Sequence, residues 1–85
     1  MGSYSVRLKR SAAKEIEALP RKERTRIIER IRALSEDPRP AGSKKLSGRE
    51  AYRIRQGAYR VVYTVGDDDH IAMVSMVAHR HDGYR

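Results

Sequence analysis

The end of the chain holds the densest group of side chains able to carry chemistry. Its last residues read His79-Arg80-His81-Asp82-Gly83-Tyr84-Arg85. Arginine binds phosphate through several N–H donors, and histidine exchanges protons near neutral pH. Tyrosine can stack on a base, and it can act as a base itself where nearby cations lower its pKa. A terminus often frays, but the apolar stretch 71–78 comes directly before this segment and should hold its first residues near a sheet.

Further cations alternate with apolar residues in the middle of the chain. In the expected strand 52–55, alternation places Arg53 and Arg55 on the face opposite to Tyr52 and Ile54. Such a spacing presents two guanidinium groups on one surface.

Arg60 stands within the expected strand 59–65, whose other face holds Tyr59, Val61, Tyr63 and Val65. Its guanidinium is always charged, so burial without a partner would be costly. Arg60 must therefore meet a carboxylate, reach solvent or bind an anion. A structural pairing with Glu50 or with an acid of the first helix stays open.

The composition points to an anionic partner. The chain has 85 residues, with 19 Lys and Arg against 11 Asp and Glu, a formal charge of +8 and a pI near 10.3. An excess of this size is typical of nucleic-acid binding, although it can also serve solubility alone. Cysteine is absent, which excludes disulfides and thiolate metal sites and fits a reducing compartment.

Several other classes of function lack their signatures. No apolar run approaches the roughly 20 residues of a membrane span, and no signal peptide is recognisable, so we expect a cytoplasmic protein without membrane contact. The run Asp67-Asp68-Asp69-His70 holds possible metal ligands, but adjacent acids in a turn splay apart and no second ligand cluster exists. We expect no metal and no cofactor. A nucleophile elbow and a Gly-rich phosphate loop are also missing.

The order of hydrophobic periods predicts an α+β fold. Residues 4–8 alternate as a strand, with Tyr4, Val6 and Leu8 on one face. Two helices follow: one over 12–19 with Ser11 as its N-cap, and one over 21–35 after Pro20. Apolar residues at helical spacing form one stripe on the second helix, namely Ile27, Ile28, Ile31 and Leu34.

The second half of the chain changes to a period of two. Pro38 and Pro40 end the second helix, and residues 41–48 are expected to form a loop that bears Lys44 and Lys45. Strands are expected at 52–55, 59–65 and 71–78, joined by short turns that favour an antiparallel meander. We therefore predict a single domain over 1–85: an N-terminal strand, a two-helix hairpin and a three-stranded antiparallel meander, with the helices on one sheet face.

This pattern resembles the RelE family of bacterial toxins, within the RelE/ParE superfamily. The resemblance rests on the order of elements, on the segment Tyr52-Arg53-Ile54-Arg55-Gln56-Gly57-Ala58-Tyr59-Arg60-Val61-Val62-Tyr63 and on the ending after Ala78. It implies a RelE-like fold and a type II toxin that cuts mRNA in the ribosomal A site. It also implies an acidic, RelB-like antitoxin as partner, and contact with operator DNA only through the toxin–antitoxin complex.

The resemblance also implies roles for particular residues. It matches the family's basic strand to Arg53 and Arg55, its Tyr-Arg strand to Arg60, and its ending to Arg80 and Tyr84. We expect catalysis by Arg55, Arg60, Arg80, Tyr84 and His81. We expect RNA binding by Lys44, Lys45, Arg53, His79 and Arg85. Position 81 is commonly Arg in the family and position 83 commonly apolar, where this chain has His81 and Gly83.

Three functions remain in competition at this point. The first is a metal-independent, ribosome-dependent endoribonuclease that inhibits translation. The second is a ParE-like inhibitor of DNA gyrase without nuclease activity, which the same fold could support. The third is a module that binds nucleic acid or antitoxin and has lost catalysis. The gathering of arginines around one strand pair favours the first function, because a protein-binding poison would not need it.

Overall fold

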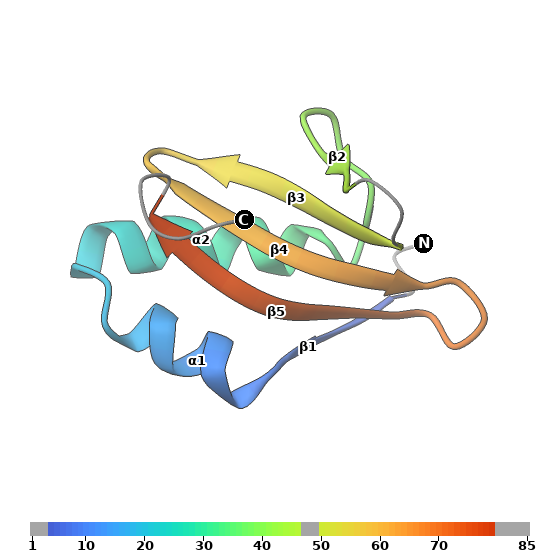
Figure 1. The fold of residues 1–85 in the computed structure, drawn as a ribbon, viewed down its shortest axis with the longest axis horizontal. Helices are drawn as coiled ribbons and strands as arrows, with labels where there is room; N and C mark the ends of the chain where they lie inside the picture. The colour runs from blue at the N-terminus through green and yellow to red at the C-terminus, as the bar shows by residue number, and fades with distance from the viewer. Residues whose placement is uncertain (1–3, 47–49, 80–85) are drawn as a thin grey trace.

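The computed structural model describes residues 4–46 and 50–79, which form a mixed sheet with two helices on one of its faces (Figure 1). Within these ranges the elements run β1 (Ser5–Leu8), α1 (Arg10–Glu17), α2 (Arg21–Ala33), β2 (Lys44–Lys45), β3 (Ala51–Gln56), β4 (Tyr59–Gly66) and β5 (Ile71–His79). The described strands form one five-stranded sheet in the order β1-β5-β4-β3-β2. The α+β class is confirmed.

The strand pairing follows from the lengths of the connections. Short turns join β3 to β4 and β4 to β5, and both pairs are antiparallel, which confirms the expected meander. β1 instead pairs in parallel with β5, from Ser5 opposite Ile71 to Leu8 opposite Val74. A parallel pair needs a long crossover, and α1 and α2 lie in it, so both helices pack on the same face of the sheet.

A core lies between the helices and the sheet. It includes Ala12 and Ile16 of α1, Ile27 and Ile31 of α2, and buried side chains from the three long strands. These strand residues are Tyr52, Ile54, Val61, Tyr63, Val65, Val74 and Val77. The alternation predicted for β3 and β4 is therefore confirmed, and it leaves Arg53, Arg55 and Arg60 on the face without helices.

The start of α1 differs from the sequence prediction. α1 begins at Arg10, its N-cap is Lys9, and Ser11 lies inside the helix without capping it. The backbone N–H of Lys9 donates to the carbonyl of Val74 on β5 (2.9 Å). Strand pairing thus extends up to the helix and fixes its first residue, and this tertiary contact overrides the preference of serine for the cap position. Leu8 also differs, since it is 43% exposed, whereas Tyr4 and Val6 pack against the core.

The prediction that residues 41–48 form a loop is wrong at Lys44 and Lys45. These residues form β2, which pairs antiparallel with β3 so that Lys44 lies opposite Arg53 and Lys45 opposite Tyr52. The N–H of Leu46 adds a hydrogen bond to the carbonyl of Ala51 (2.8 Å). A two-residue strand is too short to show any alternation, so hydrophobic periodicity could not reveal it.

Neither helix among residues 4–46 and 50–79 combines the length and the apolar character that crossing a bilayer requires.

Tyr63 offers a direct test of how the segment after α2 is attached to the sheet. Its side chain is fully buried, and its hydroxyl donates to the carbonyl of Pro38 at 2.7 Å. We expect Tyr63→Phe to lower the free energy of unfolding by about 1–2 kcal/mol, because the buried carbonyl loses its donor. Urea denaturation measures this loss. Tyr59→Phe is the control, because the Tyr59 hydroxyl makes no recorded hydrogen bond within the described chain; an equal loss in both variants would contradict the assignment.

Candidate nucleic-acid interface

Strand register brings Lys44, Arg53, Arg55 and Arg60 together on the helix-free face of the sheet, and we call these residues the basic cluster. Lys44 lies directly opposite Arg53, and Arg55 lies directly opposite Arg60. Side chains at directly opposed positions have Cβ atoms roughly 4.5–5.5 Å apart, and like charges in such pairs destabilise a sheet. The fold therefore accepts two unfavourable cross-strand pairs, one between β2 and β3 and one between β3 and β4.

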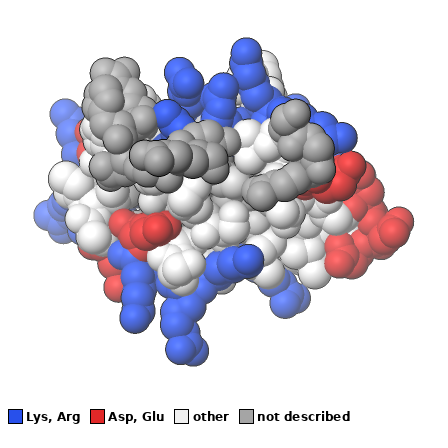
Figure 2. Space-filling view, viewed as in Figure 1, with Lys and Arg blue, Asp and Glu red and all other residues white. Residues whose placement is uncertain are grey.

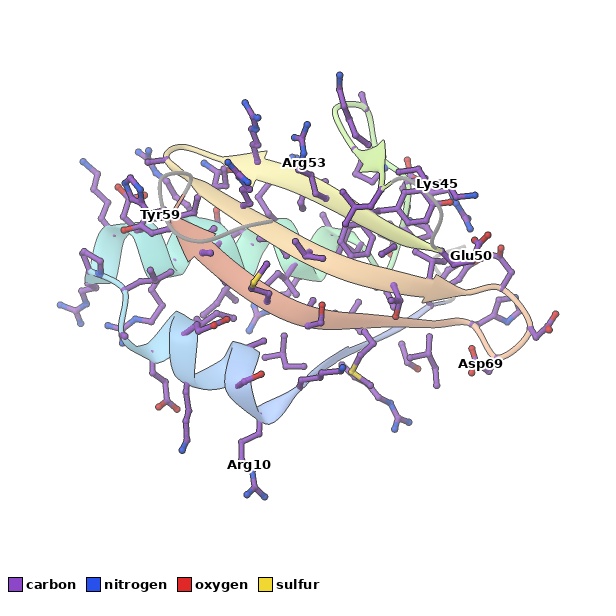
Figure 3. The ribbon with its side chains drawn as sticks, in the orientation of Figure 1. Arg10, Lys45, Glu50, Arg53, Tyr59 and Asp69 are labelled. Carbon is purple, nitrogen blue, oxygen red and sulfur yellow. The ribbon has the colours of Figure 1, made fainter. Side chains whose placement is uncertain are left out.

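The surroundings of the basic cluster differ along the sheet. Lys44 and Arg55 are exposed, and Arg53 and Arg60 are half-buried. Across β4 and β5 the same face continues with uncharged residues, since Arg53 neighbours Val62 and Arg60 neighbours Ala78. Figure 2 shows this division, with Lys and Arg along the β2–β3 side and uncharged side chains over β4 and β5. Arg53 on β3 is labelled in Figure 3.

Lys45 lies apart from the basic cluster. Its register partner is Tyr52, whose ring belongs to the core on the helix-covered side. The Lys45 ammonium forms an ion pair with Glu50 across the start of β3 (Nζ to Oε2, 3.3 Å; Figure 3). Glu50 is thus a partner of Lys45. It precedes the Ala51–Thr64 end of the β3–β4 pair, whereas Arg60 lies opposite Arg55 near the other end.

His79 also lies apart from the basic cluster, on the other face of the sheet. Its register partner is Tyr59, and the two rings meet edge to face with centroids 5.4 Å apart. Tyr59 packs against the core on the helix side. His79 lines a groove of about 580 Å³ with Glu15 and Leu19, and Glu15 Oε1 accepts the Val77 N–H at 2.8 Å.

The other residues with expected roles lie outside the described residues. These are Arg80, His81, Tyr84 and Arg85. Arg80 directly follows β5, whose Ala78 lies opposite Arg60 on the face of the basic cluster.

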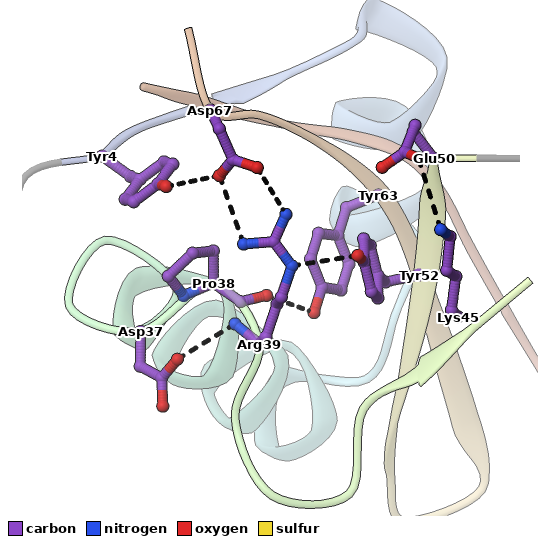
Figure 4. Close-up of polar contacts among 9 residues, drawn as sticks. All are labelled: Tyr4, Asp37, Pro38, Arg39, Lys45, Glu50, Tyr52, Tyr63 and Asp67. Atoms are coloured by element: carbon purple, nitrogen blue, oxygen red, sulfur yellow. Dashed lines mark hydrogen bonds and ion pairs between the residues drawn. The ribbon is translucent and has the colours of Figure 1, made fainter. Parts of the chain in front are cut away.

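A polar network that the sequence did not reveal holds the end of the sheet near β2. Arg39, in the segment between α2 and β2, makes a bidentate ion pair with Asp67 in the β4–β5 turn (3.2 and 2.9 Å). Its Nε donates to the Tyr52 hydroxyl (2.9 Å), and its guanidinium lies 5.1 Å from the centre of that ring. The Tyr4 hydroxyl donates to Asp67 at 2.6 Å. We call Arg39, Asp67, Tyr4 and Tyr52 the latch (Figure 4).

The charges of the latch shift the pKa values of its members. The hydrogen bond from Arg39, followed by that from Tyr4, holds the pKa of Asp67 below its ordinary 3.8. The hydrogen bond that the Tyr4 hydroxyl donates to Asp67 raises the pKa of Tyr4, because the carboxylate holds the phenolic proton. Burial raises the pKa of the neighbouring Tyr63. The acids of this turn are exposed, and Asp67 also pairs with Arg39, a residue 28 positions away in the sequence. Pairings so distant leave no local signal.

Histidine and the acids do not gather into any group able to hold a metal ion within residues 4–46 and 50–79.

The fold is that of a small α+β domain with a basic sheet face, and comparison with known proteins gives its family. A family model described as the ParE toxin of the type II toxin–antitoxin system parDE matches residues 6–84. A toxin named RelE1 from Methanocaldococcus jannaschii is 30% identical over 86 residues, covering 96% of each chain. This chain belongs to the RelE/ParE family of toxins of type II toxin–antitoxin systems.

Solved structures of similar proteins agree with this assignment. The RelBE2 toxin–antitoxin complex of Mycobacterium tuberculosis contains a chain with a TM-score of 0.81 and 27% identity, covering 96% of this chain and 97% of its own. For the intact RelBE complex of Escherichia coli, the TM-score is 0.79 and the identity 28%, and the match covers 91% of this chain and 96% of the other. For the RelE–RelB complex of Pyrococcus horikoshii, the TM-score is 0.79 and the identity 25%, and the match covers 95% of this chain and 99% of the other. The expected RelE-like fold is confirmed.

The latch predicts how stability depends on pH. The pKa of Asp67 is lower in the folded chain than in the unfolded chain, so its ion pair stabilises the protein above pH 3.8 and is lost as the pH falls through the folded value. We expect wild type to melt at a higher temperature than Asp67→Asn at about pH 6, and the difference to shrink toward about pH 2. Thermal unfolding followed by circular dichroism measures it.

Asp68→Asn is the matched control for this pH dependence. Asp68 lies in the same turn and makes no recorded hydrogen bond or ion pair within the described chain, so its replacement should leave the melting temperature nearly unchanged. A difference between wild type and Asp67→Asn that stays constant down to low pH would contradict the role of this ion pair.

Proposed function

We propose that this toxin is a metal-independent endoribonuclease that cuts mRNA in the ribosomal A site and thereby stops translation. The observation that supports it most is the basic cluster, in which Arg53 and Arg55 of β3 lie opposite Lys44 of β2 and Arg60 of β4, respectively. Such pairs cost stability in the free protein. A polyanion that binds between them removes the repulsion, and an RNA backbone is such a polyanion.

The proposed chemistry is transfer of the phosphate to the neighbouring ribose hydroxyl. The 2′-OH attacks the adjacent phosphorus, its proton goes to a base, and the bond from phosphorus to the 5′-oxygen of the next nucleotide breaks as that oxygen gains a proton. The products are a 2′,3′-cyclic phosphate and a 5′-hydroxyl end. Arg55, Arg60 and Arg80 stabilise the negative charge of the phosphorane in this proposal, which is the largest catalytic contribution in reactions of this kind.

Proton transfer in this proposal falls to the end of the chain. Histidine side chains can exchange protons near neutral pH, so His81 can serve as acid or base with less adjustment than Tyr84. Tyr84 can stack on a base or orient the 2′-OH, and it becomes a base only if nearby arginines lower its pKa. Lys44, Arg53 and Arg85 hold the RNA backbone. Lys45 and His79 lie off the basic cluster, so we place any RNA contact of theirs away from the scissile phosphate.

An acidic, RelB-like antitoxin is the proposed protein partner, and operator DNA would be contacted only through that complex. Support comes from the relatives, since the M. tuberculosis, P. horikoshii and E. coli structures are RelB–RelE-type complexes of toxin with antitoxin. The net charge of +8 also favours an acidic peptide, because its carboxylates can neutralise the same cations that hold RNA. We place the toxin in the cytoplasm, where ribosomes and antitoxin are present.

Cleavage in a translating extract tests the proposal. Mapping of mRNA 5′ ends should show cuts at A-site codons only when ribosomes are present. Arg55→Gln and Arg80→Ala should each lower the cleavage rate by about 100-fold or more, the usual effect of removing one group that stabilises the transition-state charge. Tyr84→Phe and His81→Gln are measured in parallel. The variant that loses cleavage activity identifies the residue that acts as the base.

Arg26→Gln is the matched control, because it removes the same charge from the exposed surface of α2, away from the basic cluster. It should cleave at nearly the wild-type rate. If well-folded wild type leaves mRNA intact while ribosomes translate, the nuclease proposal is wrong, and a gyrase assay for DNA breakage tests the alternative toxin activity. Salt-sensitive RNA binding without any product would instead indicate a module that has lost catalysis.

A further inference from the structure

The position of Lys44 in the basic cluster needs an explanation, because little within β2 itself holds it there. β2 is two residues long and pairs only with β3, at the edge of the sheet. Its first residue, Lys44, lies opposite Arg53, so the pair is repulsive at the point where the strand must form. A strand this short contributes few ladder hydrogen bonds to offset the repulsion.

The ion pair inside this region is a weak tether. Lys45 and Glu50 are joined at 3.3 Å, but their side chains are 53% and 72% exposed. Exposed pairs of a flexible lysine with a carboxylate contribute little to stability and are screened by salt. The restraint on β2 must therefore come from a neighbouring segment.

The latch lies directly upstream of β2 and has the geometry that a restraint requires. Arg39 is five residues before Lys44, and its guanidinium is held on Asp67 by two hydrogen bonds and on Tyr52 by a third. The backbone N–H of Arg39 also donates to Asp37 Oδ1 (3.0 Å). A bidentate arginine–carboxylate pair within such a network is the kind of surface ion pair that does hold a fixed geometry.

The latch also sets the direction in which the chain leaves it. The Tyr63 hydroxyl fixes the carbonyl of Pro38, and a turn closes from Ser43 N–H to the carbonyl of Pro40 (3.0 Å), directly before β2. Tyr52, which binds Arg39, is the residue opposite Lys45 in the β2–β3 pair. The latch and the strand pair thus share one β3 residue, and Figure 4 shows how closely they are connected.

We propose that Asp67 and Arg39 are positioning residues for RNA binding: their ion pair keeps β2 on β3 and so holds Lys44 beside Arg53 against the repulsion. This inference rests on the proposed function for its RNA partner. Neither Asp67 nor Arg39 needs to touch RNA. Asp67 lies in the β4–β5 turn, far along the sheet from the Arg55–Arg60 pair, and its own charge is of the wrong sign for a phosphate.

The sign of the Asp67 charge makes Asp67→Ala a sharp test. Removing an acid raises the net charge by one, so electrostatics alone predicts tighter RNA binding. The inference predicts the opposite: weaker binding, because Lys44 is released from the basic cluster. For a short 2′-O-methyl RNA, which cannot be cleaved, the slope of log K against log salt should become shallower by about 0.7, the amount expected for one lost phosphate contact on a single strand. Asp68→Ala carries the same charge change and should bind as tightly as wild type or more tightly.

A double-mutant cycle shows whether the effect passes through Lys44. Lys44→Ala should weaken RNA binding in wild type and should add almost nothing in Asp67→Ala, because the contact is already lost there. Additive losses would mean that Asp67 acts by another route and would overturn the inference. Should Asp67→Ala fail to fold, Asp67→Asn, which keeps the side-chain shape, takes its place in the cycle.

Hydrogen exchange separates this inference from the proposed function. The Leu46 N–H, bonded to the Ala51 carbonyl at 2.8 Å, reports pairing of β2 with β3 without any RNA. Faster exchange at Leu46 in Asp67→Ala than in Asp68→Ala supports the positioning role, and equal exchange overturns it. If Leu46 is deprotected while Lys44→Ala has no effect on RNA binding, the positioning of β2 stands and RNA binding by Lys44 is wrong.

Discussion

The arrangement of this protein depends on one constraint: β3 carries arginines that lie directly opposite cations on both neighbouring strands. Lys44 lies directly opposite Arg53, and Arg55 lies directly opposite Arg60, so two pairs of cationic side chains start from facing positions in the sheet. These contacts oppose folding, so the rest of the chain must offset them. The offset is on the other face, where Ile54, Val61 and Tyr63 of the same two strands are fully buried against the helices. One face of β3 and β4 stabilises the protein, and the other is free to carry charge.

Those parts of the structure that depend on local periodicity could be predicted from the sequence. The apolar stripe of α2 and the alternation in β3 and β4 fixed which side chains face the core, and hence that Arg53, Arg55 and Arg60 share a surface. An arginine inside an apolar strand is a conspicuous signal, because its charge cannot be buried alone. The resemblance to RelE toxins added the order of the elements, and the family match over residues 6–84 agrees with it.

The parts that the sequence did not give are fixed by contacts between distant residues. β2 forms because β3 offers it a free edge and, in our proposal, because Asp67 holds Arg39. Neither contact produces a hydrophobic pattern within residues 41–48. The start of α1 is set by the bond from Lys9 to Val74, so the local preference of Ser11 does not decide it. The chemistry of His79 alone groups it with the RNA-binding residues. The β4–β5 register shifts between Val62 and Tyr63, and this irregularity brings His79 opposite Tyr59.

The distribution of charge suggests why such a toxin is suited to control by an acidic partner. The acids of the β4–β5 turn lie at one end of the sheet, and Asp67 is occupied by the latch, whereas the residues directly opposite Arg53 are Lys44 on β2 and Val62 on β4. An internal carboxylate there would relieve the repulsion in the free protein but would also compete with phosphate. Leaving the repulsion in place means that any polyanion that binds, whether RNA or antitoxin, gains the free energy released when the like charges are neutralised. The same unfavourable pairs that weaken the isolated sheet would thus favour binding of both the proposed substrate and the proposed inhibitor.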